Sequence, residues 1–482
     1  MRRRRQSWVI LIAAAGALAL GAAGTAASAG QATVPAGPVS GTPVAGTPQL
    51  ASTGSTEQVR QLVQCGNTMY AVGSFSSVKR YNNVVSRNNV FSFSAVKPYK
   101  MTTWNPDVNG VVNSIAFNGS NCAAAYIGGK FSSVDGTAAK NIAEISTSTG
   151  AVVTSFGHNA EAQVSTLLAV KGHLLAGGYF TSINNSKADP YFASLSPATG
   201  KDDNWFHLNI SGHYDWAPFN GEPAVASNPT RVYNQSLSHS GQYDLLMGDF
   251  TTAGGLPRQQ IFMLSLGASQ PSVTGWTSPE WDGSQGEATP QDPTSGYPFE
   301  CAWNEPYYIQ AASWSPDDST IYIATTGYHP YGWSTDPSEQ ARTGLCDAAA
   351  AFPATANPPQ QGNGQPGYVL HNWVNYTGCD SLFATAADAS TAYIGGHERW
   401  SSNPNGCDDA GPGAISAPGM EGLSPASGVL TFNPGRARGL GADDMLVTGA
   451  GLWIASDNLD NSQTCGGVSS HAGICLLPYP AG

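Results

Sequence analysis

The stretch from Trp104 to Phe156 decides the fold of this chain. It reads WNPDVNGVVNSIAFNGSNCAAAYIGGKFSSVDGTAAKNIAEISTSTGAVVTSF. Four apolar runs of strand length alternate in it with turns that are rich in Gly, Asn and Ser. This pattern predicts four short antiparallel strands. Such a unit cannot bury both of its faces alone, so we expect it to pack against further copies of itself.

Related units follow one another along the chain, with insertions of different length between them. Each unit centres on an apolar run, which leads into Gly-Gly-x-Phe in units two and three and into part of this motif in units one, four and six, whereas units five and seven are degenerate. The seven runs contain Tyr70, Tyr126, Leu175, Leu245, Tyr322, Tyr393 and Trp453. Seven four-stranded units predict an all-β fold, a seven-bladed β-propeller of antiparallel blades with long loop insertions on one face. Because the last unit ends after its third strand, a segment near Gln49–Val59 should supply the missing outer strand.

The repeat resembles that of the delta-sixty repeat family, which are secreted bacterial β-propellers similar to kelch and quinoprotein-like propellers. The resemblance rests on Trp-Asn-Pro, Gly-Gly-x-Phe and a Thr-Gly or Ser-Gly turn, as at Trp104–Pro106, Gly128–Phe131 and Gly177–Phe180. It implies the fold for most of residues 59–482. No catalytic residue is carried over, because one propeller scaffold serves many functions.

The repeated residues themselves indicate packing. We expect the recurring phenylalanines to lie in the core between blades, and the paired glycines to allow close strand approach or a bulge. Trp104 and Phe432, at the Trp-Asn-Pro position, should pack likewise. The four phenylalanines are Phe75, Phe131, Phe180 and Phe250.

The first 55 residues divide into two segments. Arg2–Arg5, the apolar run from Trp8 and the Ala27-Ser28-Ala29 site predict a secretory signal peptide over residues 1–29, rather than a membrane anchor. Residues 30–55 are rich in Gly, Pro, Ala and Thr and predict a linker, which leaves 56–482 for the propeller. We therefore expect a secreted, extracellular protein without a transmembrane segment in the mature chain.

The charge of the mature chain narrows the partners. Cleavage would remove four of 21 basic residues and none of the 33 acidic ones, so 17 against 33 leaves a net charge of −16. Nucleic-acid binding needs positive charge to release counterions, so this balance argues against it and against anionic membranes. It suits a soluble extracellular protein, which we expect to be a monomer.

Eight cysteines in an exported chain predict disulfides rather than metal ligands. Spacing alone leaves the connectivity open. The nearest-neighbour arrangement pairs Cys65 with Cys122, Cys301 with Cys346, Cys379 with Cys407, and Cys465 with Cys475.

Long insertions indicate the working face. If the strands of a unit run outward from the axis, five insertions emerge on one face, where second strands connect to third strands and where consecutive units connect. They are Asn209–Thr230, Trp281–Pro306, Gly327–Gly364, Gly396–Pro412 and Ser456–Gly473. Long loops on a rigid scaffold are where function usually lies.

Aromatic and hydrogen-bonding residues gather in these insertions, as expected where sugar rings stack or a protein binds. The candidate ligand-binding residues are Asp215, Trp216, Trp303, Glu305, Tyr328, His329, Tyr331, Trp333, His397, Glu398 and Trp400. The alternative is that these large side chains fill the small core of their own loops.

Two function classes follow from this face. The first is a non-catalytic extracellular binding protein for a glycan or another protein. The second is a carbohydrate-active or other hydrolytic enzyme that uses carboxylates such as Glu300, Glu305 and Glu398. We predict no cofactor; calcium is an alternative at the Asp-rich turns Asp317-Asp318 and Asp457–Asn461. Gly362–Gly367 matches a dinucleotide fingerprint in letters only, because Pro366 stands where a helix should start.

Overall fold

The computed structural model describes residues 37–213, 229–267, 269–281, 308–327, 344–362, 364, 366–436, 438–459, 464–465, 468–469 and 471–480. These residues are almost entirely β-strand, turn and loop, with one short 3-10 helix, η1 (Pro279–Trp281). Each sheet is antiparallel, which follows from the short turns between sequential strands. The all-β class predicted from the sequence is confirmed.

Seven sheets of three or four strands carry the fold in the described residues. The first three are β2 (Gln58–Cys65), β3 (Thr68–Ser74), β6 (Val90–Ser94); β7 (Val111–Asn118), β8 (Asn121–Lys130), β11 (Ile142–Ser146); and β12 (Val164–Val170), β13 (His173–Gly178), β14 (Phe192–Leu195). The next two are β15 (Arg231–Leu237), β16 (Tyr243–Asp249), β19 (Ile261–Ser265), β20 (Ser272–Val273); and β21 (Ile309–Trp314), β22 (Thr320–Thr325), β23 (Ala348–Pro353), β24 (Trp373–Tyr376). The last two are β25 (Leu382–Ala387), β26 (Ala392–Gly396), β29 (Met420–Leu423), β30 (Leu430–Phe432); and β31 (Asp444–Thr448), β32 (Gly451–Ala455), β35 (Ile474–Pro478).

Short strands decorate the connections between second and third strands. In the first sheet, β4 (Ser77–Arg80) pairs with β5 (Asn83–Ser86) and also with β1 (Gln49–Leu50). Four other connections each carry one pair: β9 (Ser133–Val134) with β10 (Thr137–Ala138), β17 (Thr252–Ala253) with β18 (Leu256–Pro257), β27 (Trp400–Ser401) with β28 (Ile415–Ser416), and β33 (Thr464–Cys465) with β34 (Val468–Ser469).

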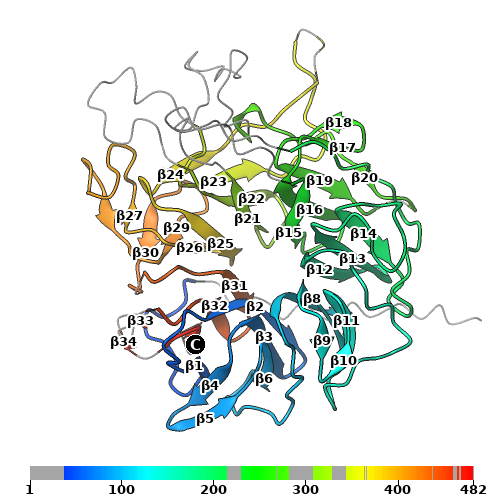
Figure 1. Ribbon diagram of the computed structural model, residues 1–482. Coiled ribbons are helices and arrows are strands. Elements are labelled where there is room, and N and C mark those ends of the chain that lie inside the picture. The colour runs from blue at the N-terminus through cyan, green and yellow to red at the C-terminus, as the bar shows by residue number, and fades with distance from the viewer. Residues whose placement is uncertain are drawn as a thin grey trace, which may run out of the picture. The chain divides into compact units, whose positions relative to one another are not determined.

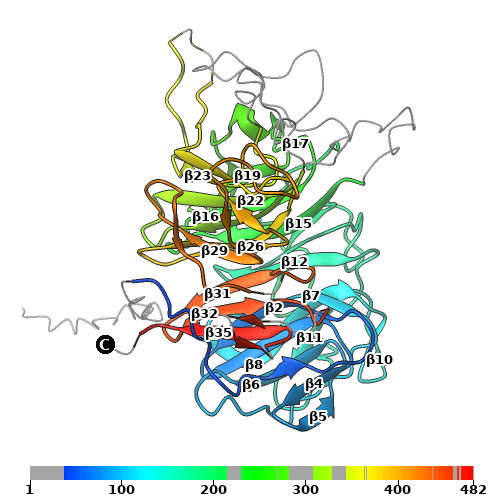
Figure 2. The same cartoon turned by 90° about the vertical axis from the view of Figure 1, so that its left-hand side faces the viewer.

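The sheets stand around a common axis within residues 33–482, which form one compact unit. Figure 1 looks along this axis and Figure 2 shows the same sheets from the side. The inner strand of each sheet contacts the inner strands of its two neighbours, in the order β2, β7, β12, β15, β21, β25 and β31. The last of them contacts β2 again, although the sheets remain separate hydrogen-bonded units. Radial sheets around an axis are the architecture of a β-propeller.

The hydrophobic core lies between the sheets rather than at the centre. Each cluster of buried apolar residues joins two consecutive sheets. One cluster joins the last sheet to the first, where the rings of Phe93 and Trp453 lie 5.6 Å apart. Phe75, Phe131, Phe180 and Phe250 are at most 5% exposed in these clusters, so their predicted packing role is confirmed. Trp104 is buried as well, and Phe432 packs half-buried against its cluster.

The predicted four strands per sheet are found in only some of the seven sheets. Three of the sheets have four strands and four have three. In the first three sheets the outer strand is reduced to one bridge, at Phe93–Met101, Ile145–Val152 and Leu195–Asp202. The outer edge there carries turn residues, which support only one ladder contact each.

The last sheet is completed by the N-terminal segment. The backbone N–H groups of Ser40 and Val44 donate to the carbonyls of Pro478 and Leu476, at 2.7 and 3.0 Å. Leu50 continues the same antiparallel course by donating to Ala472. The completing segment was predicted, but its main contacts lie before Gln49–Val59 and inside the predicted linker. Residues 39–50 are therefore held on the outer edge of β35, because that edge would otherwise leave backbone groups unpaired.

The paired glycines stand where strands approach too closely for a side chain. A Cβ atom on Gly73, Gly129, Gly178, Gly248 or Gly396 would come within 3.0 Å of a carbonyl oxygen on the inner strand of the same sheet. In all five cases the facing inner strand has a bulge at this point. The two predicted features, close approach and bulge, therefore occur together: the glycine lets its strand approach closely, and the facing inner strand carries the bulge. We call this combination the glycine–bulge device.

Three of the predicted disulfides are present: Cys65–Cys122, Cys379–Cys407 and Cys465–Cys475. The first joins the hairpins of two consecutive sheets, the second joins the connection between the fifth and sixth sheets to a loop of the sixth, and the third lies within the last sheet. Cys346 is disulfide-bonded too, and Cys301, its expected partner, lies outside the described residues. No described cysteine is free.

One predicted insertion is shorter than expected. The Ala-rich run Ala348–Pro353 forms β23, the third strand of the fifth sheet, inside the predicted loop Gly327–Gly364. Alanine carries little strand preference, so the run does not look like a strand in the sequence. Because β23 runs antiparallel to β22, residues 354–372 connect strands at the opposite face.

Candidate functional site: a ring of bulged residues at the channel mouth

Six of the seven inner strands contain a bulge close to their first residue. The extra residues are Arg60, Asn113, Ser165, Tyr233, Gln310 and Phe383. In the seventh sheet Asp443 takes this place, because its N–H donates to the carbonyl of Ala455, the register partner of Asp444. A bulge re-aims one side chain away from the ladder. We call these seven residues the bulge ring.

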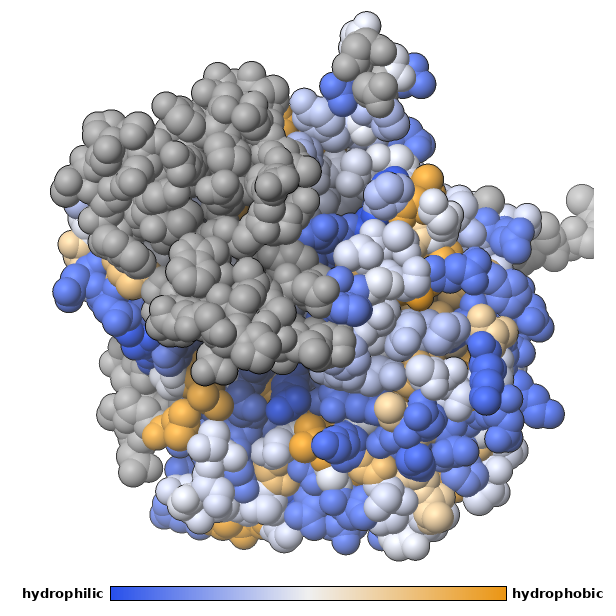
Figure 3. All heavy atoms as spheres, turned by 45° about the horizontal axis from the view of Figure 1, so that its top comes forward, coloured by the Kyte–Doolittle hydropathy of each residue, from blue (hydrophilic) through white to orange (hydrophobic). Residues whose placement is uncertain are grey.

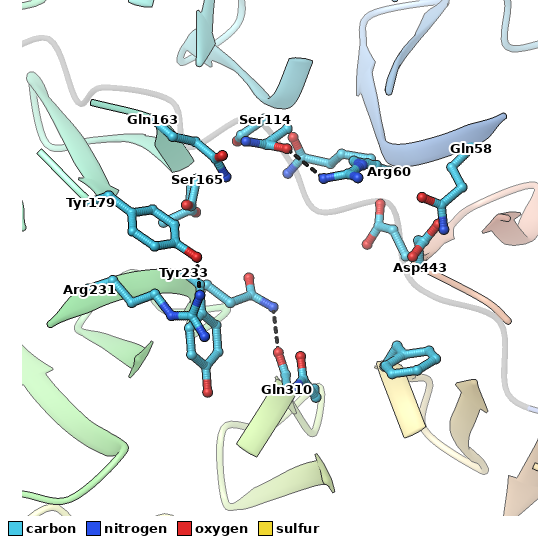
Figure 4. A pocket seen from close by; sticks show the side chains of 16 residues that line it. Gln58, Arg60, Ser114, Gln163, Ser165, Tyr179, Arg231, Tyr233, Gln310 and Asp443 are labelled. Atoms are coloured by element: carbon cyan, nitrogen blue, oxygen red, sulfur yellow. Dashed lines mark hydrogen bonds between the residues drawn. The ribbon is translucent and has the colours of Figure 1, made fainter. Parts of the chain in front are cut away.

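The bulge ring lines one cavity of about 460 Å³ at the axis. All seven of its members face this cavity, with Gln58, Gln163, Tyr179 and Arg231 beside them. Figure 4 shows these side chains converging from several sheets. The cavity opens at the face of the insertions, since Thr230 ends one of them just before β15. The site is therefore at the channel mouth on the predicted working face.

The chemistry of the bulge ring changes from sheet to sheet while its setting stays the same. The residue before each bulged position is apolar and not exposed at all: Val59, Val112, Val164, Val232, Ile309, Leu382 and Ala442. The bulged position itself holds Arg, Asn, Ser, Tyr, Gln, Phe or Asp. Packing therefore constrains the preceding residue, whereas the bulged residue faces the cavity and can differ from sheet to sheet.

The residue that follows the bulge ties neighbouring inner strands together. Gln61 accepts from the N–H of Ile115 at 2.7 Å, and Ser114 accepts from Leu167 at 3.0 Å. Similar bonds involve Thr166 with Gln235, Asn234 with Gln310, and Asp444 with Leu62. These bonds hold the frame of the cavity rigid, which lets the bulge ring point inward with fixed geometry.

The fifth and sixth sheets lack this tie because Ala311 and Ala384 occupy the position. A second cavity of about 280 Å³ borders both alanines deeper along the axis. The channel is therefore asymmetric, with its hollow side at these two sheets.

Charged residues lie on both sides of the mouth. Arg231 lies with Tyr179 and Tyr233 on one side, and Asp443 lies with Gln58 and Arg60 on the other (Figure 4). Burial raises the pKa of Asp443 to about 7, against the lowering effect of Arg60. Burial likewise raises the pKa of Asp444 to about 6, although its hydrogen bond from Leu62 acts the other way. The acidic side therefore loses charge near neutral pH.

The ligand-binding residues predicted from the insertions are only partly visible. Asp215, Trp216, Trp303, Glu305, Tyr328, His329, Tyr331 and Trp333 lie outside the described residues, as does Glu300. They remain predictions. His397, Glu398 and Trp400 follow β26 in the sixth sheet and are described.

These three residues do not form an exposed platform. Glu398 is fully buried, and its pKa is raised well above the usual range by burial and by Glu421. A surface ligand cannot reach this carboxylate, so the placement corrects its predicted ligand contact. Trp400 donates from Nε1 to the carbonyl of Asp408 in its own loop, at 3.1 Å. Burial and Arg438 lower the pKa of His397. For this loop the alternative, a small core of its own, fits the contacts.

The Asp-rich turns use their carboxylates within the protein. Asp457 accepts from the N–H groups of Leu440, Gly441 and Leu459, and Asp317 accepts from Ser315 and Ser319. Among the residues that the structure describes, no group of three or more His, Cys, Asp and Glu side chains could hold a metal ion. None of their helices is long and apolar enough to cross a membrane.

The sequence carries only a weak signal for the bulge ring. A variable residue follows an apolar one 13 to 16 residues before the glycine of the second strand, as Arg60 before Gly73 and Asn113 before Gly129 show. Because this spacing differs between units, it does not align the variable residues.

Comparisons with known proteins identify no family and no function for this chain. No protein-family model and no curated protein matches the sequence. Among solved structures, the chain is similar to the WD40 β-propeller domain of Doa1, with 11% identity, 86% of this chain and 95% of that one covered, and a TM-score of 0.39. It is also similar to the computationally designed Ika8 protein, at 10% identity over 90% and 100% with a TM-score of 0.37. Kuenenia stuttgartiensis hydrazine synthase gives 9% identity over 82% and 92%, with a TM-score of 0.42.

Proposed function

We propose that this chain is a secreted, non-catalytic binding protein: its seven sheets are the blades of one propeller, and its ligand is a glycan held at the bulge ring. The observation that carries the proposal is the variation of one repeated position around one cavity. Membership of the delta-sixty repeat family belongs to the same proposal and is supported by the repeated Gly-Gly device.

The lining favours a glycan over an apolar ligand. Amide and hydroxyl groups of Asn113, Ser165 and Gln310 alternate around the mouth with the rings of Tyr233 and Phe383. Sugar hydroxyls need such donors and acceptors, and the apolar faces of sugar rings need aromatic contacts. The cavity also has the size of a small-molecule pocket, about 300–1,000 Å³.

The described surface gives less support to a protein ligand. Hydrophilic residues predominate among the coloured atoms in Figure 3, and apolar ones are scattered. The exposed large hydrophobic residues are few and stand on separate segments, such as Val84, Leu256 and Val429. Single exposed apolar residues are normal and do not make a docking patch.

A glycan array with residues 30–482 tests the proposal, followed by affinity measurements on two matched variants. Gln310→Ala removes an amide from the bulge ring. Gln64→Ala removes the same group from the far end of an inner strand, where Gln64 is exposed and contacts only Gly66. We expect the first variant to weaken binding about tenfold, as for loss of one or two ligand hydrogen bonds, and the second to bind normally. Equal affinities would contradict the site.

One observation favours a second candidate, a glycan hydrolase. A carboxyl group whose pKa is raised to about 7, such as Asp443 in the cavity, suits general acid catalysis. Incubating a bound oligosaccharide with the protein and measuring new reducing ends separates the two functions. Cleavage that Asp443→Asn abolishes would favour the enzyme, and an intact ligand would favour binding.

A further inference from the structure

The guanidinium of Arg231 is held in a fixed position at the cavity. It lies over the ring of Tyr179, 5.0 Å from the centroid, and over that of Tyr233 at 5.4 Å. Its Nη1 donates to the hydroxyl of Tyr179. Tyr233 is fixed in turn, because its hydroxyl donates to the carbonyl of Ile309 at 2.6 Å. A guanidinium that is stacked on rings in this way is pre-organised for a planar partner.

The hydrogen-bond and ring partners of Arg231 in the cavity carry no charge. In the part of the chain that the structure describes, no carboxylate forms an ion pair with Arg231, and its Nη2 has no hydrogen bond. Arg60 is similar, since it donates from Nη1 to the amide oxygen of Asn113 at 2.9 Å. Arg60 also lies close enough to Asp443 to lower its pKa, so Arg231 is the arginine of this cavity that has no described carboxylate in an ion pair.

A carboxylate fits this arrangement better than a more highly charged anion. The guanidinium edge can bind a carboxylate through two parallel hydrogen bonds. Asp443 and Asp444 line the same cavity. Their negative charge repels a bound anion, and this repulsion grows with the charge of the anion. A phosphate monoester carries nearly twice the charge of a carboxylate at neutral pH. A single carboxylate on a polar, hydroxyl-bearing ligand satisfies both sides of the mouth.

We propose that the ligand is a carboxylated sugar, with its carboxylate on Arg231 and its hydroxyls on bulge-ring residues such as Asn113 and Gln310. This inference rests on the proposed function and names the glycan class. The carboxylate faces the Tyr179 side, and the sugar ring extends toward Asp443, whose carboxyl group accepts or donates a hydrogen bond to a hydroxyl.

Oligogalacturonate and its methyl ester test the proposal, because the ester replaces each negative carboxylate by a neutral group with one added methyl. Calorimetry on residues 30–482 should give an affinity for the free acid at least about tenfold above that for the ester, as for one charge-assisted pair. Arg231→Gln should remove this preference, and Arg231→Lys should keep the charge but restore only part of it. Arg80→Gln is the matched control, since Arg80 also lies over a tyrosine ring but outside the cavity.

The possible failures can be told apart. Equal binding of acid and ester, or binding of neutral glycans alone, overturns the carboxylate proposal and leaves the bulge ring as a glycan site. Preference for a sulfated or phosphorylated oligosaccharide over the free acid overturns it as well. Loss of acid and ester binding to the same extent in Arg231→Gln assigns Arg231 a structural role, which the buried Asp249 on the paired strand would explain. Absence of binding to any glycan overturns both proposals.

Discussion

A Cβ atom on Gly248 would lie within 3.0 Å of the carbonyl oxygen of Arg231. The glycine on the second strand and the bulge on the first are thus two halves of one device. The device brings the strands together and turns Tyr233, the residue that follows Val232, toward the axis. The same contact, repeated in other sheets, connects the Gly-Gly motif of the repeat to the geometry of the cavity.

Substitution of a glycine in this device should therefore destabilise the fold. Gly129 meets the carbonyl of Val111 in the same way and lies away from Arg231. We expect Gly129→Ala to lower the free energy of unfolding by about 1–3 kcal/mol, as for overpacking. Gly362→Ala is the control, because nothing lies within 4 Å of that position. Equal urea midpoints for the two variants would be inconsistent with the device.

Phe131 tests the core between the first two sheets. It is 5% exposed and belongs to the cluster that joins them. Phe131→Ala should cost about 3–5 kcal/mol in unfolding free energy without changing the relative affinities for two glycans. A loss of stability below 1 kcal/mol in urea titration would place Phe131 outside a packed core.

The N-terminal segment, residues 39–50, should stabilise the ring by completing its last sheet. A chain that begins at Ser52 lacks Ser40, Val44 and Leu50, which pair with the last sheet. We expect it to melt at a lower temperature and to be cut faster by protease near β35 than a chain that begins at Gly37. Identical melting curves would mean that the stability of the ring does not depend on residues 39–50.

Stability should depend on pH through buried carboxyl groups. Burial raises the pKa of Glu421 from 4.5 to about 7, so the folded chain binds this proton more tightly than the unfolded chain. Between these two values the free energy of unfolding therefore falls as pH rises. Burial of His397 and His471 lowers their pKa values and acts in the opposite direction below their ordinary value.

Comparison with Glu421→Gln isolates the carboxyl group from these histidines. From pH 5 to pH 8 the wild-type chain should lose stability relative to the variant, with most of the change complete by about one unit above the raised pKa. Thermal melts in a pH series give this difference directly. A difference that is constant across the series would show that Glu421 does not titrate in this range.

Much of the fold follows from the sequence because the repeat is local. Alternating apolar runs, glycines and, in the first four units, one phenylalanine define a sheet and its packing face, and these four phenylalanines are buried as predicted. Two features could not be read in this way. β23 is built largely from alanines, which form a strand here only because neighbouring strands pair with them. The pairing of Ser40 and Val44 depends on the free edge of a sheet more than 400 residues away along the chain.

The site was harder to predict than the fold. Aromatic residues in long insertions attracted attention, whereas the described Glu398 is buried and Trp400 bonds to its own loop. The bulge ring cannot be read from the sequence of one strand, because a bulge adds a single residue and leaves no fixed motif. Only the combination of seven strands brings Arg60, Tyr233 and Asp443 to one cavity.

Photocrosslinking tests the central claim, that ligand binds at the bulge ring, most directly. A diazirine derivative of the tightest glycan from the array would be activated on the protein, and the labelled peptides identified by mass spectrometry. The account predicts labels at the starts of inner strands, in peptides with Arg60, Asn113, Tyr233 or Gln310. Labels confined to residues 328–343 or 397–412, with none at these strand starts, would contradict it.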